Sequence, residues 1–133
     1  MENEKNYENL GQIGSFMLVG VEMMAADGKL LEVESSALID GYVALSGENA
    51  TKEHLDATML RVHAVRNSFA DFETKLGYIK YSMGRLGSET SDDLKNGIIG
   101  LLAGIAEADG DVDDNEIGLL AIVIAALKPN KTQ

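Results

Sequence analysis

One short segment occurs twice in the chain, and it constrains the fold more than any other feature. Residues 26–34 read ADGKLLEVE, and residues 108–116 read ADGDVDDNE. Each copy lies between two apolar runs of helical length, which is typical of the joint in a helix-turn-helix unit. The same offset aligns residues 12–45 with residues 94–127. The sequence therefore predicts two related helical pairs.

Glycine defines both turns. Gly28 and Gly110 stand where a helix commonly ends in the left-handed conformation, which glycine adopts without a Cβ penalty. In the second copy, Asp113 and Glu116 have the spacing of a capping box for the next helix. In the first copy Leu31 replaces the capping residue. The first turn is thus the poorer match.

Asp27 and Asp109 precede the two glycines, at the predicted C-terminal ends of helices. The helix dipole disfavours a negative side chain there by up to about 1 kcal/mol. One explanation is an Asx-type turn, in which the carboxylate accepts a hydrogen bond from a nearby N–H. The other is that carboxylates of both turns converge on a cation. The spacing alone leaves both open.

Composition limits the possible functions. A chain of 133 residues is long enough for one domain with a real core. It has no cysteine, which excludes a disulfide framework and a thiolate metal site. A net charge of −11 argues against a nucleic-acid partner. The N-terminus lacks the basic and apolar regions of a secretory signal, and no apolar run reaches the length of a membrane span, so we expect a cytoplasmic protein without a transmembrane segment.

Apolar spacing predicts helices throughout and no sheet of consequence. We expect a compact all-α bundle of about six to seven helices, with the two helix-turn-helix repeats related by a pseudo-twofold axis. Residues 1–9 are polar and are expected to form a frayed tail or the loose start of a helix. The single domain spans residues 10–128, followed by a tail at 129–133. Its parts are repeat one at 12–45, a middle helical pair at 51–87 and repeat two at 94–127.

Capping residues set several of the expected helix starts. Thr51 is expected to cap the third helix, Ser68 or Asp71 the fourth, and Thr90 with Asp93 the fifth. The fourth helix has the cleanest amphipathic pattern, with an expected core stripe at positions 72, 76, 79, 83 and 86. The sixth helix, 114–127, is apolar nearly all round, which is typical of the centre of a fold or of an oligomer contact.

Several single residues have simple structural interpretations. Glu22 falls near the buried side of the first helix and is expected to be a rim carboxylate paired with a base. His54 and His63 are nine positions apart, on opposite sides of a helix, so they are not expected to share a metal. Gly100 and Gly104 form a G-x-x-x-G pair, which permits close helix packing.

Known catalytic and metal-binding motifs do not fit. A calcium-binding EF-hand loop starting at Asp109 would need glycine at its sixth position and glutamate at its twelfth, but Asp114 and Leu120 stand there. The chain has no P-loop, dinucleotide-binding glycine motif, H-E-x-x-H motif or nucleophile elbow. We therefore expect no enzymatic activity. A hydrolase that uses paired carboxylates would need converging acids in a cleft.

The two turns resemble those of the tellurite-resistance TerB family, whose relatives include the N-terminal domain of a membrane-anchored DnaJ-type co-chaperone. The family turn, [A/S]-D-G-x-[hydrophobic]-[D/S]-x-x-E, is matched by residues 108–116 and, except at Leu31, by residues 26–34. The Leu-Gly-Phe that often follows the last helix is replaced by Leu127-Lys128-Pro129. The resemblance spans about residues 15–127 and implies an all-α domain.

The resemblance also implies a function. It implies an intracellular protein of stress or metal-resistance systems that works beside membrane-embedded partners. It further implies a cation site formed by Asp27, Glu34, Asp109 and Glu116, whose hard oxygen ligands suit Ca²⁺ or Mg²⁺. The leading hypothesis is a non-enzymatic domain that binds a divalent cation or a protein partner through its acidic turns. The alternative is a metal-free interaction or oligomerisation module, for example a homodimer through the sixth helix.

Overall fold

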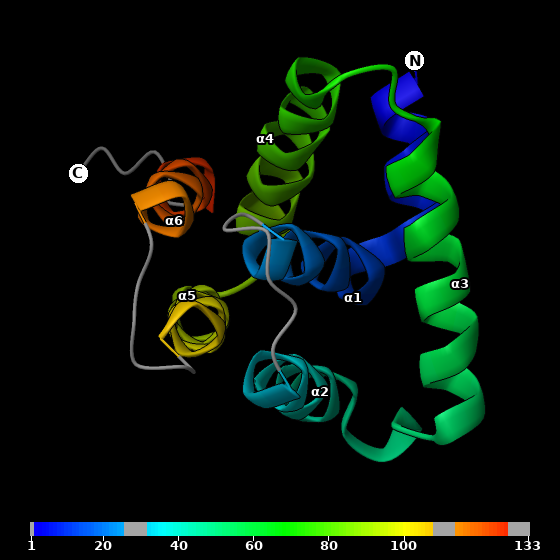
Figure 1. The fold of residues 1–133 in the computed structure, drawn as a ribbon. Coiled ribbons are helices and arrows are strands. Elements are labelled where there is room, and N and C mark those ends of the chain that lie inside the picture. Colours follow the sequence, from blue (N-terminus) through cyan, green and yellow to red (C-terminus); the bar gives the residue numbers. More distant parts are fainter. Residues whose placement is uncertain (1, 26–31, 108–113, 128–133) are drawn as a thin grey trace.

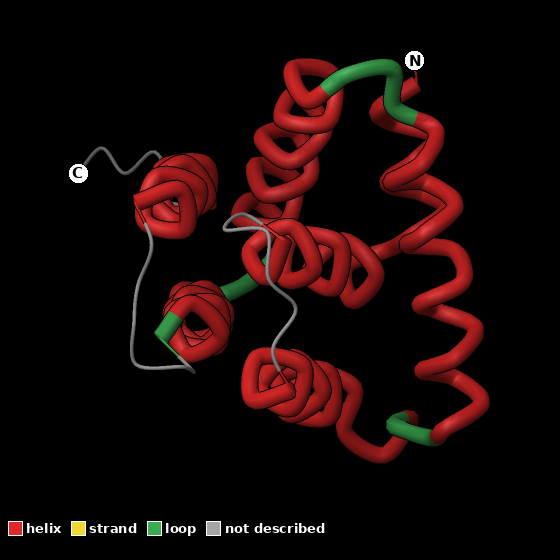
Figure 2. The backbone as a smooth tube through the Cα atoms, in the orientation of Figure 1, coloured by secondary structure: helices red, strands yellow, loops and turns green. Residues whose placement is uncertain are grey.

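The computed structural model describes residues 2–25, 32–107 and 114–127, without the side chains of residues 32–35, 115 and 116. Within these ranges the chain forms α-helices, one short 3₁₀ helix and connecting loops, with no strand (Figures 1 and 2). The α-helices are α1 (Glu2–Ala25), α2 (Glu32–Ser46), α3 (Lys52–Ser68), α4 (Phe72–Glu89), α5 (Asp92–Ala106) and α6 (Asp114–Leu127), and the 3₁₀ helix is η1 (Gly47–Asn49). The predicted all-α bundle is confirmed.

Of the two alternatives for the N-terminal residues, a frayed tail or the start of a helix, the structure has a helix. They belong to α1, and Tyr7 and Leu10 are each only 5% exposed. At Gly11 the backbone turns to φ 71°, a left-handed conformation that glycine tolerates, and α1 changes direction there (Figure 1). Asn6 is also buried, so polar composition alone did not show that this segment packs against the bundle.

Tyr7 fixes the N-terminal segment to the end of α4. Its hydroxyl donates a hydrogen bond to Glu89 Oε1 (2.9 Å), and the Arg85 guanidinium carbon lies 4.4 Å from the centre of its ring. Burial, followed by the hydrogen bond to Glu89, raises the pKa of Tyr7 above its usual value. The hydrogen bonds from Tyr7 and Arg85 lower the pKa of Glu89. The contact therefore connects the beginning of α1 to the end of α4, residues separated by more than half of the sequence.

The centre of the fold is α1 rather than α6. The second part of α1 is buried on all sides, and α1 contacts each of the other α-helices. Phe16, Met17 and Met23 have no exposed surface. α6 packs against α4 and α5, but Ile117 on its outer face is 51% exposed. The sequence of α6 is apolar on both faces although only one face is covered by the described chain.

Two of the three predicted caps are correct. The Thr51 hydroxyl accepts a hydrogen bond from the His54 N–H (3.0 Å), and Asp71 Oδ1 accepts one from the Thr74 N–H (2.8 Å). The start of α5 was predicted one residue too early, because Ser91 is its cap. Thr90 instead closes α4, since its hydroxyl donates a hydrogen bond to the Leu86 carbonyl. A Ser or Thr beside a helix end can serve either helix, and the sequence does not say which.

The Asp71 cap predicts a pH dependence. Hydrogen bonds from the Thr74 hydroxyl and N–H lower the pKa of Asp71 from its usual 3.8. Its contribution to stability is therefore present above the pKa of the unfolded state and is lost as the pH falls through the lower pKa of the folded state. Asparagine also caps helices but does not titrate. Near neutral pH, we expect Asp71→Asn to unfold at the same urea concentration as the wild type. In acid, we expect the variant to lose less stability than the wild type. Equal losses in acid would contradict this role.

Close helix contacts occur at glycines other than the G-x-x-x-G pair. A Cβ atom added to Gly100 or Gly104 would meet nothing within 4 Å. A Cβ at Gly41 would lie 2.8 Å from Phe16, and one at Gly87 would overlap the backbone oxygen of Leu127. The contact between α4 and α6 therefore requires the absence of a side chain at position 87.

Candidate functional site

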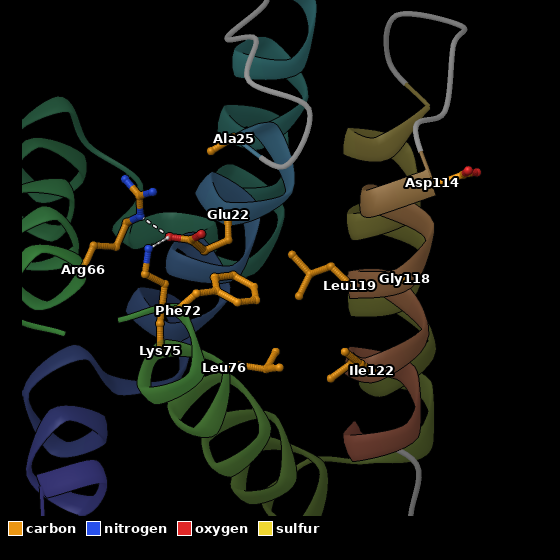
Figure 3. A pocket seen from close by; sticks show the side chains of 10 residues that line it. All are labelled: Glu22, Ala25, Arg66, Phe72, Lys75, Leu76, Asp114, Gly118, Leu119 and Ile122. Atoms are coloured by element: carbon orange, nitrogen blue, oxygen red, sulfur yellow. Dashed lines mark hydrogen bonds and ion pairs between the residues drawn. The ribbon is translucent and has the colours of Figure 1, made fainter. Parts of the chain in front are cut away.

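A buried cluster of charges joins three helices. Glu22 of α1 is only 6% exposed, and its Oε2 atom forms ion pairs with Nε of Arg66 and, at 3.1 Å, with Nζ of Lys75 (Figure 3). The side chains of Arg66 and Lys75 are 21% and 18% exposed. The expectation that Glu22 pairs with a base is confirmed, with two bases in place of one.

Local helix structure brings these three side chains together. Arg66 lies in the last turn of α3, where a cation interacts favourably with the helix dipole. The Asp71 cap then starts α4, which places Lys75 one turn into that helix. The end of α3 and the start of α4 therefore present one cation each to the carboxylate of α1.

An open cleft of about 620 Å³ lies beside the charge cluster, between α1, α4 and α6. Its lining combines the three charged residues with Asp114 and with apolar or small residues. The remaining lining residues are Ala25, Phe72, Leu76, Gly118, Leu119 and Ile122. Figure 3 shows the charged cluster at one side of the cleft and the apolar side chains of α4 and α6 facing each other at the other.

Phe72 departs from its expected place in the core stripe of α4. It is 58% exposed, whereas Ile79 and Met83 on the same helix are fully buried. Phe72 is the first residue of α4 and stands at the mouth of the cleft, beyond the end of the packed stripe. The apolar spacing of α4 was predicted correctly. That spacing does not show how far along α4 the stripe is covered by another helix.

A second cleft, of about 370 Å³, lies between α1, α2 and α3. Met17, Met24 and Met59 contribute to its mostly apolar lining, and Ala25 and Arg66 line both clefts. His63 lines this second cleft, whereas the His54 ring stacks on Tyr42 at 5.7 Å. The two histidines therefore have different surroundings.

The expected cation ligands are only partly within the described chain. Asp27 and Asp109 lie outside it, together with both turn glycines and Asp113. Glu34 and Glu116 belong to the first turns of α2 and α6, but their side chains are not described. The described residues alone contain no group of three or more His, Asp or Glu side chains placed to hold a metal.

The described residues that flank the two turns share one cleft. Ala25, the last residue of α1, and Asp114, the first residue of α6, line the same cleft. The residue before the first turn and the residue after the second turn thus lie on the same side of the bundle.

Sequence reasoning missed Arg66 and Lys75 as partners of one carboxylate. Arg66 is 44 residues from Glu22 in the chain. The available signals were a carboxylate on the apolar side of a helix and two cations on the amphipathic helices of the middle pair. These signals show that a partner is needed but do not identify it, because the choice depends on how the helices cross.

The chain also shows no helix among the described residues with both the length and the hydropathy to cross a bilayer. Comparison with curated proteins and with solved structures gives no significant match. Residues 15–133 match the family described as Tellurite resistance protein TerB. The matched region covers both turns and all of the charge cluster, and the chain therefore belongs to the TerB family.

Proposed function

We propose that this TerB-family domain is a non-enzymatic cytoplasmic module that binds a divalent cation through its two acidic turns. The ligands are Asp27 and Glu34 from the first turn and Asp109 and Glu116 from the second. Their carboxylate oxygens suit Ca²⁺ or Mg²⁺. In a stress or metal-resistance system, the cation-bound form would present the turns to a protein partner, including partners at a membrane.

The observation that supports a shared site is the common position of Ala25 and Asp114 on one cleft. Each of these residues lies within a few positions of a proposed ligand aspartate. A turn of six residues can bring a carboxylate several ångströms toward its neighbour. Both turns also belong to an acidic chain, with a net charge of −11, which attracts cations.

The arrangement of the carboxylates in the cleft favours a non-enzymatic role. The Glu22 carboxylate is paired with the side chains of Arg66 and Lys75, and Asp114 points away from the cleft (Figure 3). A general acid and base would have to face a common substrate position. Glu22 and Asp114 do not provide that geometry.

Cation binding is tested by calorimetric titration of chelator-treated protein with Ca²⁺ and Mg²⁺ and by thermal unfolding with each ion. A cation that binds only the folded state at about one hundred times its dissociation constant should stabilise that state by about 2.7 kcal/mol. We expect Asp27→Ala and Asp109→Ala each to abolish this gain. Asp40→Ala, in the middle of α2, removes an equal charge away from the turns and should retain it. Absence of heat and of a thermal shift at millimolar ion would exclude the site.

A second candidate function is supported by exposed apolar side chains. Ile39 and Val43 on α2 are 45% and 49% exposed, and Ile117 on α6 is 51% exposed. Contiguous exposed apolar surfaces are typical of protein contacts, and Ile39 and Val43 lie one turn apart on α2. A metal-free module of this kind could form a homodimer through α6. Ile117→Glu should then shift sedimentation from dimer to monomer, and a wild-type protein that stays monomeric at high concentration would rule the dimer out.

A further inference from the structure

We infer that the cleft between α1, α4 and α6 binds a small monocarboxylate with an apolar chain. The carboxylate would contact Lys75 and Arg66, and the chain would lie between α4 and α6. This site uses residues other than the four proposed cation ligands. It therefore does not require those four ligands.

The charge of the cluster favours an anion. Glu22 supplies one negative charge, whereas Arg66 and Lys75 supply two positive charges, and both are directed at the same carboxylate oxygen. The pair with Arg66 uses Nε, and Figure 3 shows the two terminal nitrogens of Arg66 directed away from Glu22. Among these three residues one positive charge therefore remains in excess, and the side chain of Asp114, the other charged residue of the lining, points away from the cleft (Figure 3). One carboxylate on the ligand would balance this excess charge, and partial burial strengthens that attraction.

The opposite part of the cleft favours an apolar chain. Phe72 and Leu76 of α4 face Leu119 and Ile122 of α6 across the open space (Figure 3). Phe72 leaves 58% of its surface exposed, which is unusual for a phenylalanine beside a helix interface. An aliphatic chain that covers these side chains would gain affinity with each methylene removed from water. An inorganic anion would leave them uncovered.

The volume of the cleft is compatible with a small organic ligand. The cleft measures about 620 Å³, and pockets for small organic ligands range from about 300 to 1,000 Å³. The charged side and the apolar side are adjacent, so a ligand with one charged end can satisfy both. A small free acid fits this description.

The test is a titration of the ¹⁵N-labelled full chain with sodium octanoate and, separately, with octanamide, which has the same chain without the charge. Octanoate should shift the amide signals at the start of α4 and along α6, and octanamide should bind at least about tenfold more weakly, the scale of a charge-assisted hydrogen bond. Lys75→Gln should weaken the binding of octanoate by about the same factor. Lys80→Gln, on an exposed position of α4, is the matched control and should change nothing.

A second variant keeps the test valid if Lys75→Gln disturbs the fold. Phe72→Ala changes a side chain that is 58% exposed, so the protein should remain folded and bind both probes more weakly. Asp27→Ala should leave octanoate binding unchanged, which separates this site from the cation site. The proposal is overturned if octanoate causes no shifts at millimolar concentration, or if octanamide binds equally well. It is also overturned if the peptide N-acetyl-Ala-Ala-Leu binds more tightly than octanoate, which would indicate a protein C-terminus as the ligand.

Discussion

Replacing Glu22 with alanine is expected to lower the free energy of unfolding by about 3 kcal/mol, the scale for removing one partner of a buried ion pair. The reason is that Arg66 and Lys75 would remain close together without the carboxylate between them. Both are largely shielded from water, with side chains 21% and 18% exposed. The remaining exposure allows partial solvation, which is why we expect the lower end of the range. Urea unfolding at neutral pH measures the change.

Two comparisons isolate the ion pairs from other effects. Asp40→Ala removes a carboxylate from an exposed position of α2 and should change stability by less than about 0.5 kcal/mol. Adding Arg66→Met and Lys75→Met to Glu22→Ala removes the unpaired cations and should restore much of the lost stability. A Glu22→Ala protein as stable as the wild type would show that the two cations find other partners.

Gly87→Ala is expected to destabilise the fold by about 2 kcal/mol, as overpacked sites do. The added Cβ would overlap the backbone oxygen of Leu127, and backbone cannot rotate away as a side chain can. α6 must therefore move from α4. Alanine favours the helix by up to about 1 kcal/mol over glycine, so this estimate is the balance of a larger clash and a smaller gain. Thermal and urea unfolding measure it.

Gly84→Ala is the matched control for this prediction. Gly84 lies in the same helix, and a Cβ there would meet nothing within 4 Å. Only the higher helix propensity of alanine then changes the stability, and the variant should be more stable than the wild type by about 0.5 to 1 kcal/mol. If both variants are stabilised by the same amount, the close contact at Gly87 does not constrain the fold.

Local signals predicted most of the helices. Thr51 and Asp71 mark the starts of α3 and α4 because each side chain satisfies a free N–H within three residues. The apolar spacing predicted the range of α6, Asp114–Leu127, as the structure has it. These features depend on neighbours in the chain, and a single sequence contains that information.

Features that depend on distant residues were not predicted. The packing of Tyr7 depends on Glu89 and Arg85 at the far end of α4. The convergence of Arg66 and Lys75 on Glu22 depends on how three helices cross. For the proposed cation ligands, the sequence supplies two similar turns, and the structure adds that Ala25 and Asp114 share a cleft. The ligand set itself stays a prediction.

The absence of a side chain at Gly87 has a consequence for the opposite end of the same two helices. α4 and α6 are in close contact at Gly87 and Leu127, near their C-terminal ends, whereas Phe72 and Asp114, where both helices begin, line the cleft. The two helices diverge from Gly87 toward their first residues. Because a helix rises about 1.5 Å per residue, Phe72 lies roughly 22 Å from Gly87. The width of the cleft at Phe72 thus depends on how closely the backbones of α4 and α6 approach at Gly87. A ligand in the cleft would not touch Gly87.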